Sequence, residues 1–315
     1  MPKTTPTGYW TFFCNPAKWE IDRFLATGRT RDHYSITDWQ AEWFAPGQLG
    51  VIRVGIDRRS KKVLAGRARL RPGVYAIVHV LEHPRERGRT DEEFWVSRET
   101  PDPTGLVVEV EYVRTLLDSP IHLAALEGEG IEDRYLLEGF QAASMPLTAS
   151  SFRRVRELAR VDDSLLGAAV RQVPGTVDEI ARLESRYGAA APEVSEIVSK
   201  RIERGPAASR YKKVAGYRCQ LCEQMGKPSV GFTTIRGVPY IEVHHVRPVS
   251  TGATGTLGPS NLIAVCANHH RQLHYGRSEL VSTEVDHFEF VVDGKHVRIP
   301  RLAKPVAEES AERLS

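Results

Sequence analysis

The stretch that organises this chain runs from Arg218 to His274, and it reads Cys219-Gln-Leu-Cys222, then Glu242-Val-His244-His245, then Asn261, then Cys266-Ala-Asn-His269-His270-Arg-Gln-Leu-His274. Its cysteines and histidines form two sets that alternate along the chain. In the first set, two residues separate the members of each pair, and this spacing lets both side chains face one tetrahedral ion. We therefore predict a closed, structural Zn²⁺ site with four ligands: Cys219, Cys222, Cys266 and His269.

The second set contains four more histidines, which a structural ion does not need. His270 and His274 stand four residues apart, so a helix would place them on one face. His244 and His245 form an adjacent pair further upstream. A zinc module without catalysis is the alternative interpretation, but such a module requires neither the His-His pair nor the His-x3-His spacing.

This arrangement resembles the HNH family of nucleases, in which a β-hairpin followed by a helix, the ββα-metal fold, holds one catalytic metal. The resemblance covers roughly residues 205–280. It implies that His245 is the general base, which takes a proton from the water that attacks a phosphodiester. It also implies that His244 and His270, with His274 as a third ligand, hold a divalent ion such as Mg²⁺, Mn²⁺, Ni²⁺ or Co²⁺.

Two further residues gain roles from the same resemblance. Asn261 is expected to orient its loop and, through a hydrogen bond, the general base. Glu242 lies two residues before His244, hence on the same face of a strand, and is expected to support a metal ligand.

Length and composition set the frame for the rest of the chain. A chain of 315 residues with a formal net charge of +3 is long enough for two domains, and its charge does not by itself indicate nucleic-acid binding. Three of its four cysteines belong to the zinc set, which argues for a reducing compartment. We find no apolar run that could span a membrane and no secretory leader, so we expect a cytoplasmic protein.

The N-terminal half predicts a small, strongly bent sheet or open barrel. Strand-like segments alternate with turn residues, and amphipathic helices flank them. The expected strands are residues 9–14, 50–55, 63–70, 74–80 and 106–113, and the expected helices are residues 19–25 and 150–158.

The order of these elements resembles an EVE domain, a relative of the PUA and YTH folds. The resemblance spans about residues 8–160 and rests on Tyr9-Trp10 with Asn15-Pro16, on residues 34–38, 50–54 and 64–66, on Pro120-Ile121, and on residues 140–148. It implies a pocket that captures a flipped, modified base between aromatic faces and polar groups. The candidate walls are Trp10, Trp39 and Trp43, and the candidate polar groups are Asn15, Gln141 and Ser144.

Basic residues near each predicted site suggest contacts with the DNA backbone. Alternation along the expected strand 63–70 and beyond would place Arg67, Arg69 and Arg71 on one sheet face, suited to phosphates. Solvated surface is the alternative for such a run. Lys212 and Lys213 precede the first zinc pair and are expected to clamp a phosphate at the nuclease entrance.

We therefore predict an α+β protein with three parts. Residues 1–160 form the EVE-like domain, residues 161–209 a helical linker, and residues 210–315 the zinc-stabilised HNH domain with a C-terminal hairpin at Asp293-Gly294. Residues 177–187 and 191–204 are the expected linker helices, and an oligomerisation helix remains an alternative for them.

Together the halves resemble a modification-dependent, type IV-like restriction endonuclease. The expected substrate is double-stranded DNA that carries 5-methylcytosine, 5-hydroxymethylcytosine or a bulkier cytosine modification. Because one HNH site cuts one strand, a homodimer is expected. Two alternatives stay open: a non-catalytic protein that binds modified RNA or DNA, and an HNH nuclease of the repair or homing type that ignores modification.

Overall fold

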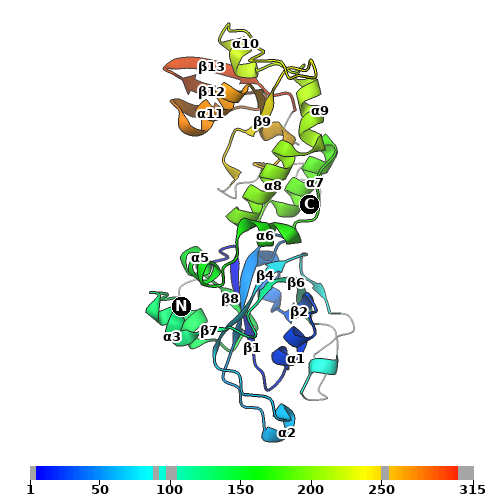
Figure 1. The fold of residues 1–315 in the computed structure, drawn as a ribbon, viewed down its shortest axis with the longest axis vertical. Coiled ribbons are helices and arrows are strands. Elements are labelled where there is room, and N and C mark those ends of the chain that lie inside the picture. The colour runs from blue at the N-terminus through cyan, green and yellow to red at the C-terminus, as the bar shows by residue number, and fades with distance from the viewer. Residues whose placement is uncertain (1–4, 88–91, 97–104, 250–254, 304–315) are drawn as a thin grey trace, which may run out of the picture. The chain divides into compact units, whose positions relative to one another are not determined.

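The computed structural model describes residues 5–87, 92–96, 105–249 and 255–303. The chain forms two compact units (Figure 1). Unit 1 comprises Met1–Arg171 and Ala189–Val194, and unit 2 comprises Gln172–Gly188 and Ser195–Ser315. None of the helices within the described ranges has the length and apolar character needed to cross a bilayer.

Unit 1 is built on one mixed sheet in the order β2-β6-β4-β3-β1-β8, with β5 paired to β6 and β7 to β4. β1 runs parallel to β3, and the other pairs are antiparallel. Register shifts on both sides of β4 bend the sheet, so the expected bent sheet is confirmed. The strands are β1 (Tyr9–Cys14), β2 (Arg31–Ser35), β3 (Leu49–Val54), β4 (Gly73–Val80), β5 (Arg85–Glu86), β6 (Leu106–Thr115), β7 (Ile121–His122) and β8 (Ser144–Pro146).

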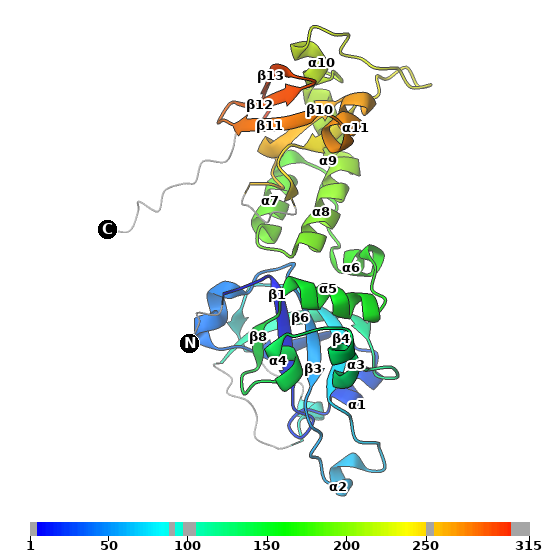
Figure 2. The same ribbon diagram turned by 90° about the vertical axis from the view of Figure 1, so that its left-hand side faces the viewer.

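Short helices flank this sheet, and α3, α4 and α5 lie over one of its faces (Figure 2). α5 begins after Thr148, whose hydroxyl caps it by accepting from the backbone N–H of Ser151. The helices of unit 1 are α1 (Ile21–Ala26), η1 (Asp38–Trp43), α2 (Lys61–Leu64), η2 (Glu92–Phe94), α3 (Leu123–Gly128), α4 (Arg134–Glu138), α5 (Ala149–Leu158) and α6 (Asp163–Ala169).

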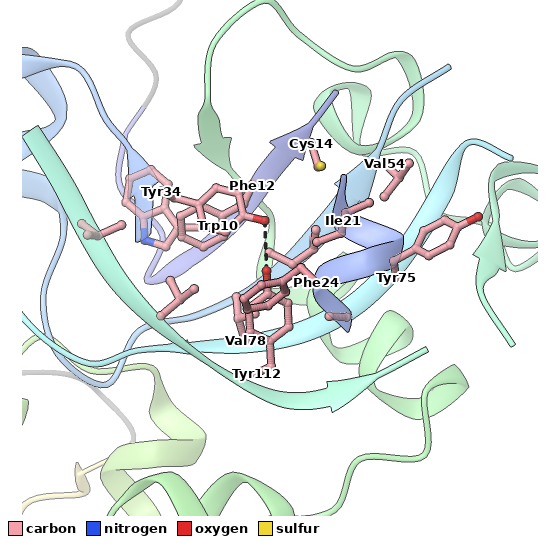
Figure 3. Close-up of a cluster of buried hydrophobic side chains, with 14 of the residues drawn as sticks. Trp10, Phe12, Cys14, Ile21, Phe24, Tyr34, Val54, Tyr75, Val78 and Tyr112 are labelled. Carbon is pink, nitrogen blue, oxygen red and sulfur yellow. Dashed lines mark hydrogen bonds between the residues drawn. The ribbon is translucent and has the colours of Figure 1, made fainter. Parts of the chain in front are cut away.

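An aromatic cluster fills the space between the sheet and α1 (Figure 3). Trp10 is fully buried in it, stacks on Phe44 at a ring distance of 3.8 Å, and donates its indole N–H to Gln48 Oε1 at 2.7 Å. The hydroxyls of Tyr34 and Tyr112 meet at 3.3 Å. Trp10 has no free face for a base, so the expectation that it walls a base pocket is wrong. The strand pattern alone does not reveal that η1 and the segment after it cover this face.

The segment expected as a strand at residues 63–70 is instead the single helical turn α2 and a loop. Ser60 caps the turn, and Ala65 ends it in the left-handed conformation with φ of 46°. Arg67 then bonds Asp22 at 2.8 Å and also binds Glu20. The predicted row of three arginines on a sheet face is therefore wrong, because these carboxylates draw Arg67 into the fold of unit 1.

Unit 2 combines a helical layer with two small sheets. β9 pairs with β10, and β11, β12 and β13 form a three-stranded sheet. The hairpin predicted at Asp293-Gly294 is confirmed by the β12–β13 pairing, while β11 was not expected. The elements are α7 (Val177–Tyr187), α8 (Pro192–Arg204), α9 (Pro206–Val214), α10 (Gln220–Gln224), β9 (Glu242–His245), η4 (Pro259–Asn261), β10 (Leu262–Val265), α11 (Ala267–Tyr275), β11 (Ser278–Thr283), β12 (His287–Val292) and β13 (Lys295–Pro300).

The two helices expected in the linker are formed, as α7 and α8. All of α7 and the part of α8 from Ser195 onward belong to unit 2. α7 begins with a capping box between Thr176 and Glu179. The mixture of helices and strands in both units confirms the predicted α+β class.

Candidate active site and metal centres

The four predicted zinc ligands converge in unit 2. Cys219 stands at the N-cap of α10, Cys266 stands at the N-cap of α11, and His269 lies in the first turn of α11. His269 Nδ1 lies 3.2 Å from Cys219 Sγ, 3.3 Å from Cys222 Sγ and 3.5 Å from Cys266 Sγ. A tetrahedral zinc ion with bonds of about 2.3 Å to sulfur and about 2.0 Å to nitrogen separates such ligands by roughly 3.5–3.8 Å.

The environment of this cluster also suits Zn²⁺. All four side chains are buried, and burial raises the pKa of the Cys219 and Cys222 thiols. A bound zinc ion stabilises the thiolate form of such cysteines, which burial alone disfavours. The donor set and its spacing therefore fit a closed structural zinc site.

A second cluster consists of His244 on β9 and of His270 and His274 on α11. Their rings lie 4.7–5.1 Å apart, each nearly perpendicular to the others. His244 Nδ1 and His270 Nε2 are buried and have no hydrogen-bond partner among the described residues. Burial, and then the neighbouring histidines, lower the pKa of His244 to about 3. Neutral imidazoles with unpartnered nitrogens fit a divalent metal.

Glu242 fixes one member of this cluster from the start of β9. Its Oε2 lies 2.5 Å from His270 Nδ1, and its Oε1 accepts from the Tyr240 hydroxyl at 2.7 Å. A carboxylate on one ring nitrogen leaves the other nitrogen free to bind a metal. The structure thus places Glu242 against a candidate metal ligand, as the spacing on the strand suggested, although that ligand is on α11.

His245, the candidate general base, lies on the opposite side of β9 from His244 because side chains alternate along a strand. Its side chain is 4% exposed, and its Nδ1 lies 2.8 Å from Glu203 Oε1 and 3.0 Å from Ser199 Oγ. Its Nε2 is buried without a hydrogen-bond partner in the described part of the chain. Both partners are on α8, and sequence reasoning missed them.

The contact also affects Glu203. Burial acts to raise the pKa of this carboxyl, but the hydrogen bond to His245 and the nearby histidines outweigh burial, so the pKa is lowered. The only sequence signal was that Ser199 and Glu203 lie four residues apart on a predicted helix. Such a pair is common on helices that have no role in catalysis.

Asn261 closes the loop between β9 and β10. Its Oδ1 accepts from the backbone N–H of Arg247 at 2.9 Å, and its Nδ2 donates to the carbonyls of Arg247 at 3.0 Å and of Thr256 at 2.7 Å. The expected role in orienting the loop agrees with these bonds. The expected hydrogen bond to His245 is not formed among the described residues, because both ends of the amide already bind backbone atoms.

The two lysines of the expected phosphate clamp lie in the last turn of α9. Lys213 is exposed, whereas Lys212 is half-buried. Burial lowers the pKa of Lys212, although the charge of Glu242 acts in the opposite direction. Lys212 therefore feels the charge of Glu242, and Lys213 faces solvent.

In unit 1 two of the candidate pocket residues, Trp39 and Trp43, are in contact. Trp39 is 54% exposed and meets the partly buried Trp43 edge to face at 4.9 Å on η1. Between them in sequence, Gln40 donates to the backbone carbonyl of buried Ser144 at 3.0 Å. Trp39 and Trp43 are thus in contact, and the helix that carries them is bound to Ser144 through Gln40.

Asn15 and Gln141 are exposed. The Asn15 side chain accepts from the backbone N–H of Ala17 at 3.0 Å, as a turn residue does. Arg69 donates to the Asp57 carbonyl at 2.9 Å, and Arg71 is exposed.

Residues 219–276 match the HNH endonuclease family. The chain therefore contains an HNH endonuclease domain in its C-terminal part, as the histidine and cysteine pattern predicted. The match includes both metal clusters and His245, and it excludes α8 with Glu203.

Within this domain the chain is similar to EcoKMcrA of Escherichia coli (strain K12), a type IV methyl-directed restriction enzyme. The two are 45% identical over 58 residues, which are 18% of this chain and 20% of that enzyme. The similarity thus spans about a fifth of the relative's length.

One solved structure similar to this chain is human THYN1 in complex with 5-methylcytosine containing DNA. The two are 14% identical, the alignment covers 49% of this chain and 98% of that chain, and the TM-score is 0.33. Another is Rpa0253 from Rhodopseudomonas palustris. It is 15% identical, the alignment covers 49% of this chain and 93% of that chain, and the TM-score is 0.32. At these TM-scores neither likeness assigns a fold or a ligand to this chain.

Proposed function

We propose that this protein is a modification-dependent DNA endonuclease. It binds a modified cytosine through unit 1, and the active site in unit 2 hydrolyses nearby phosphodiester bonds of the DNA. The observation that carries the nuclease half is that one strand pair and the helix after it supply both the three-histidine cluster and His245, the residue next to His244 on β9. His245 Nε2, His244 Nδ1 and His270 Nε2 are buried without partners among the described residues.

In the proposed reaction His245 accepts a proton from a water molecule through Nε2. The water oxygen bonds to phosphorus while the bond from phosphorus to the 3′ oxygen breaks, and that oxygen takes a proton from solvent. His244, His270 and His274 would hold the divalent ion, which when bound stabilises negative charge on the phosphate and on the leaving oxygen. Asn261 holds the β9–β10 loop, and Lys212 and Lys213 supply positive charge toward the DNA backbone.

The base-binding half of the proposal rests on η1. Extruding a base from a duplex costs a few kcal/mol, which aromatic stacking and hydrogen bonds offset. The exposed ring of Trp39 beside Trp43 offers such a stacking surface, and Gln40 ties η1 to Ser144. The sequence resemblance to EVE domains and the similarity of the nuclease domain to a methyl-directed restriction enzyme support the same proposal.

One active site cuts one strand, so we propose that a double-strand break requires two copies of the chain on one DNA. Sedimentation of the inactive His245→Ala variant bound to a modified duplex tests this. A complex with two copies is expected, and a complex with one copy on DNA that the wild type cuts on both strands would contradict it.

The test of the function is cleavage of matched duplexes that carry cytosine, 5-methylcytosine, 5-hydroxymethylcytosine or glucosylated hydroxymethylcytosine, with Mg²⁺, Mn²⁺, Ni²⁺ or Co²⁺. We expect cutting of one or more modified duplexes, with loss in the His245→Ala variant. Equal cutting of all four would instead indicate a nuclease that ignores modification. Binding without cutting under every metal would indicate a non-catalytic binding protein.

A further inference from the structure

We infer that Glu203, together with Ser199, is a positioning residue for His245, so that the end of α8 is a working part of the nuclease site. The inference rests on the proposed function, because it concerns the group assigned there as the general base. It adds a component that lies before the matched HNH segment, which begins at residue 219.

The contacts form a small network on one face of α8. His245 Nδ1 lies 2.8 Å from Glu203 Oε1 and 3.0 Å from Ser199 Oγ. Ser199 also donates toward Glu203 Oε1 at 3.5 Å. Ser199 and Glu203 stand four residues apart, which places both on the same side of the helix. The imidazole of His245 is therefore held by two groups from one rigid element.

The chemistry of these groups fixes the tautomer of the ring. An ionised carboxylate only accepts hydrogen bonds, so the Nδ1 atom of His245 carries the hydrogen. The lone pair of the neutral ring then resides on Nε2, the atom without a partner among the described residues. A general base needs this lone pair directed at the attacking water, and the carboxylate also stabilises the imidazolium that forms when the proton is taken.

The burial of Glu203 supports a functional role over a fortuitous contact. Its side chain is 20% exposed, and His245 lies within ion-pair distance of it. Burying a carboxylate costs free energy unless it is paired and hydrogen-bonded. A helix that served only as a spacer would gain nothing from such a group beside the candidate base.

The experiment measures single-turnover cleavage of the best modified duplex by the full chain and by three variants. Glu203→Gln keeps the shape and an acceptor oxygen but removes the charge, and Glu203→Leu removes both. Glu196→Gln alters an exposed glutamate on the same helix and is the control. We expect cleavage rate constants in the order wild type and Glu196→Gln, then Glu203→Gln, then Glu203→Leu, with the last reduced about 10- to 100-fold or more. The enzyme concentration that gives half of the maximal single-turnover rate should change less than about 2-fold, since no DNA contact is removed.

A double variant separates this inference from the proposed function. In a His245→Ala background, Glu203→Leu should cause no further loss, because its effect acts through His245. If His245→Ala cleaves like the wild type, the proposed function itself fails. If His245→Ala is inactive while Glu203→Leu cleaves at the wild-type rate, the positioning role alone is overturned.

A spectroscopic signature covers the case in which a variant is less stable. Nitrogen-15 NMR of histidine-labelled protein, with the His245 signals assigned by their loss in His245→Ala, reports which ring nitrogen carries the hydrogen. The wild type should show hydrogen on Nδ1, and Glu203→Leu should shift this population toward Nε2. An unchanged tautomer in Glu203→Leu would overturn the inference whatever the stability of the variant.

Discussion

The Nδ1 atom of His270 lies 2.5 Å from Oε2 of Glu242. This contact turns the other ring nitrogen of His270 toward the cluster that includes His244 and His274. Because carboxylates that hold metal-binding imidazoles raise ligand basicity and fix ring orientation, Glu242→Ala should weaken binding of the divalent ion by about 10- to 100-fold. Calorimetric titration with Mn²⁺ measures this. Glu279→Ala, a change at an exposed glutamate, is the matched control. An unchanged affinity for the ion in Glu242→Ala would contradict the expectation.

Removal of a zinc ligand should unfold part of unit 2. Cys222→Ser is expected to abolish the bound zinc and to lower the melting temperature of that unit, because binding energy at such sites contributes directly to folding. Metal analysis of the purified protein and circular dichroism on heating measure both effects. Cys14 is a buried thiol in unit 1, outside the zinc cluster, so the control variant Cys14→Ala should retain the zinc. If Cys222→Ser also retained zinc, the predicted site would be contradicted.

An exposed indole offers the sharpest test of base binding. Trp39→Ala should weaken binding of the preferred modified duplex by about 1–3 kcal/mol, the value typical of base stacking on an aromatic side chain. Binding to the unmodified duplex should change little. Phe140 is exposed to a similar degree, 53% against 54%, so Phe140→Ala is the control. Equal weakening of both duplexes would show that Trp39 does not select the modified base.

Trp10 should behave in the opposite way. Trp10→Ala is expected to destabilise unit 1 by about 3–5 kcal/mol, as large-to-small changes in a packed core do. All five tryptophans of the chain lie in unit 1, so tryptophan fluorescence during urea unfolding follows that unit alone. A fully stable Trp10→Ala protein that has lost only its preference for modified DNA would return Trp10 to the base pocket.

The buried pair of Asp57 and Arg59 predicts a loss of stability in acid. Their side chains meet at 2.7 Å. Burial acts to raise the pKa of Asp57, but hydrogen bonds from Arg59 and from the backbone of Leu70 outweigh it and lower the pKa to about 2. Because the folded pKa is below the unfolded one, the stabilisation is complete above about pH 4 and is lost as the pH falls toward 2.

The expected size of this acid effect is about 2 kcal/mol. Urea unfolding of unit 1 between pH 5 and pH 2, followed by tryptophan fluorescence, measures it. Asp57→Asn cannot ionise and should show a correspondingly weaker pH dependence over this range. Parallel pH curves for the two proteins would show that the pair does not contribute in this way.

The sequence predicted the metal clusters well because their information is local. The spacing of Cys219 and Cys222, or of His270 and His274, defines which side chains share a direction once a turn or helix forms. The pairing of β9 with β10 then brings the segments together. The type of each residue also limits the possibilities, since sulfur and imidazole groups in such pairs have few other uses.

Sequence reasoning failed where tertiary packing decides. Trp10 and Trp39 are both aromatic residues near strands, and only the fold shows that one is covered by Phe44 and the other is exposed. Arg67 was predicted to lie on a strand because α2, a single helical turn, is too short to leave a helical pattern in the sequence. Its carboxylate partners, Glu20 and Asp22, are distant in the sequence. Glu203 was hidden for the same reason, since its partner His245 is 42 residues distant.

The position of Glu203 on α8 has a consequence for protein engineering. A cassette cut at Cys219, where similarity to the family begins, would carry the histidines into a new host but leave the carboxylate behind. A chimaera made at that junction should bind zinc but cleave DNA slowly. A chimaera that starts before Ser199 should bind zinc and cleave DNA at the normal rate. The junction of such a chimaera should therefore lie upstream of α8, so that the helix and the histidines are transferred together.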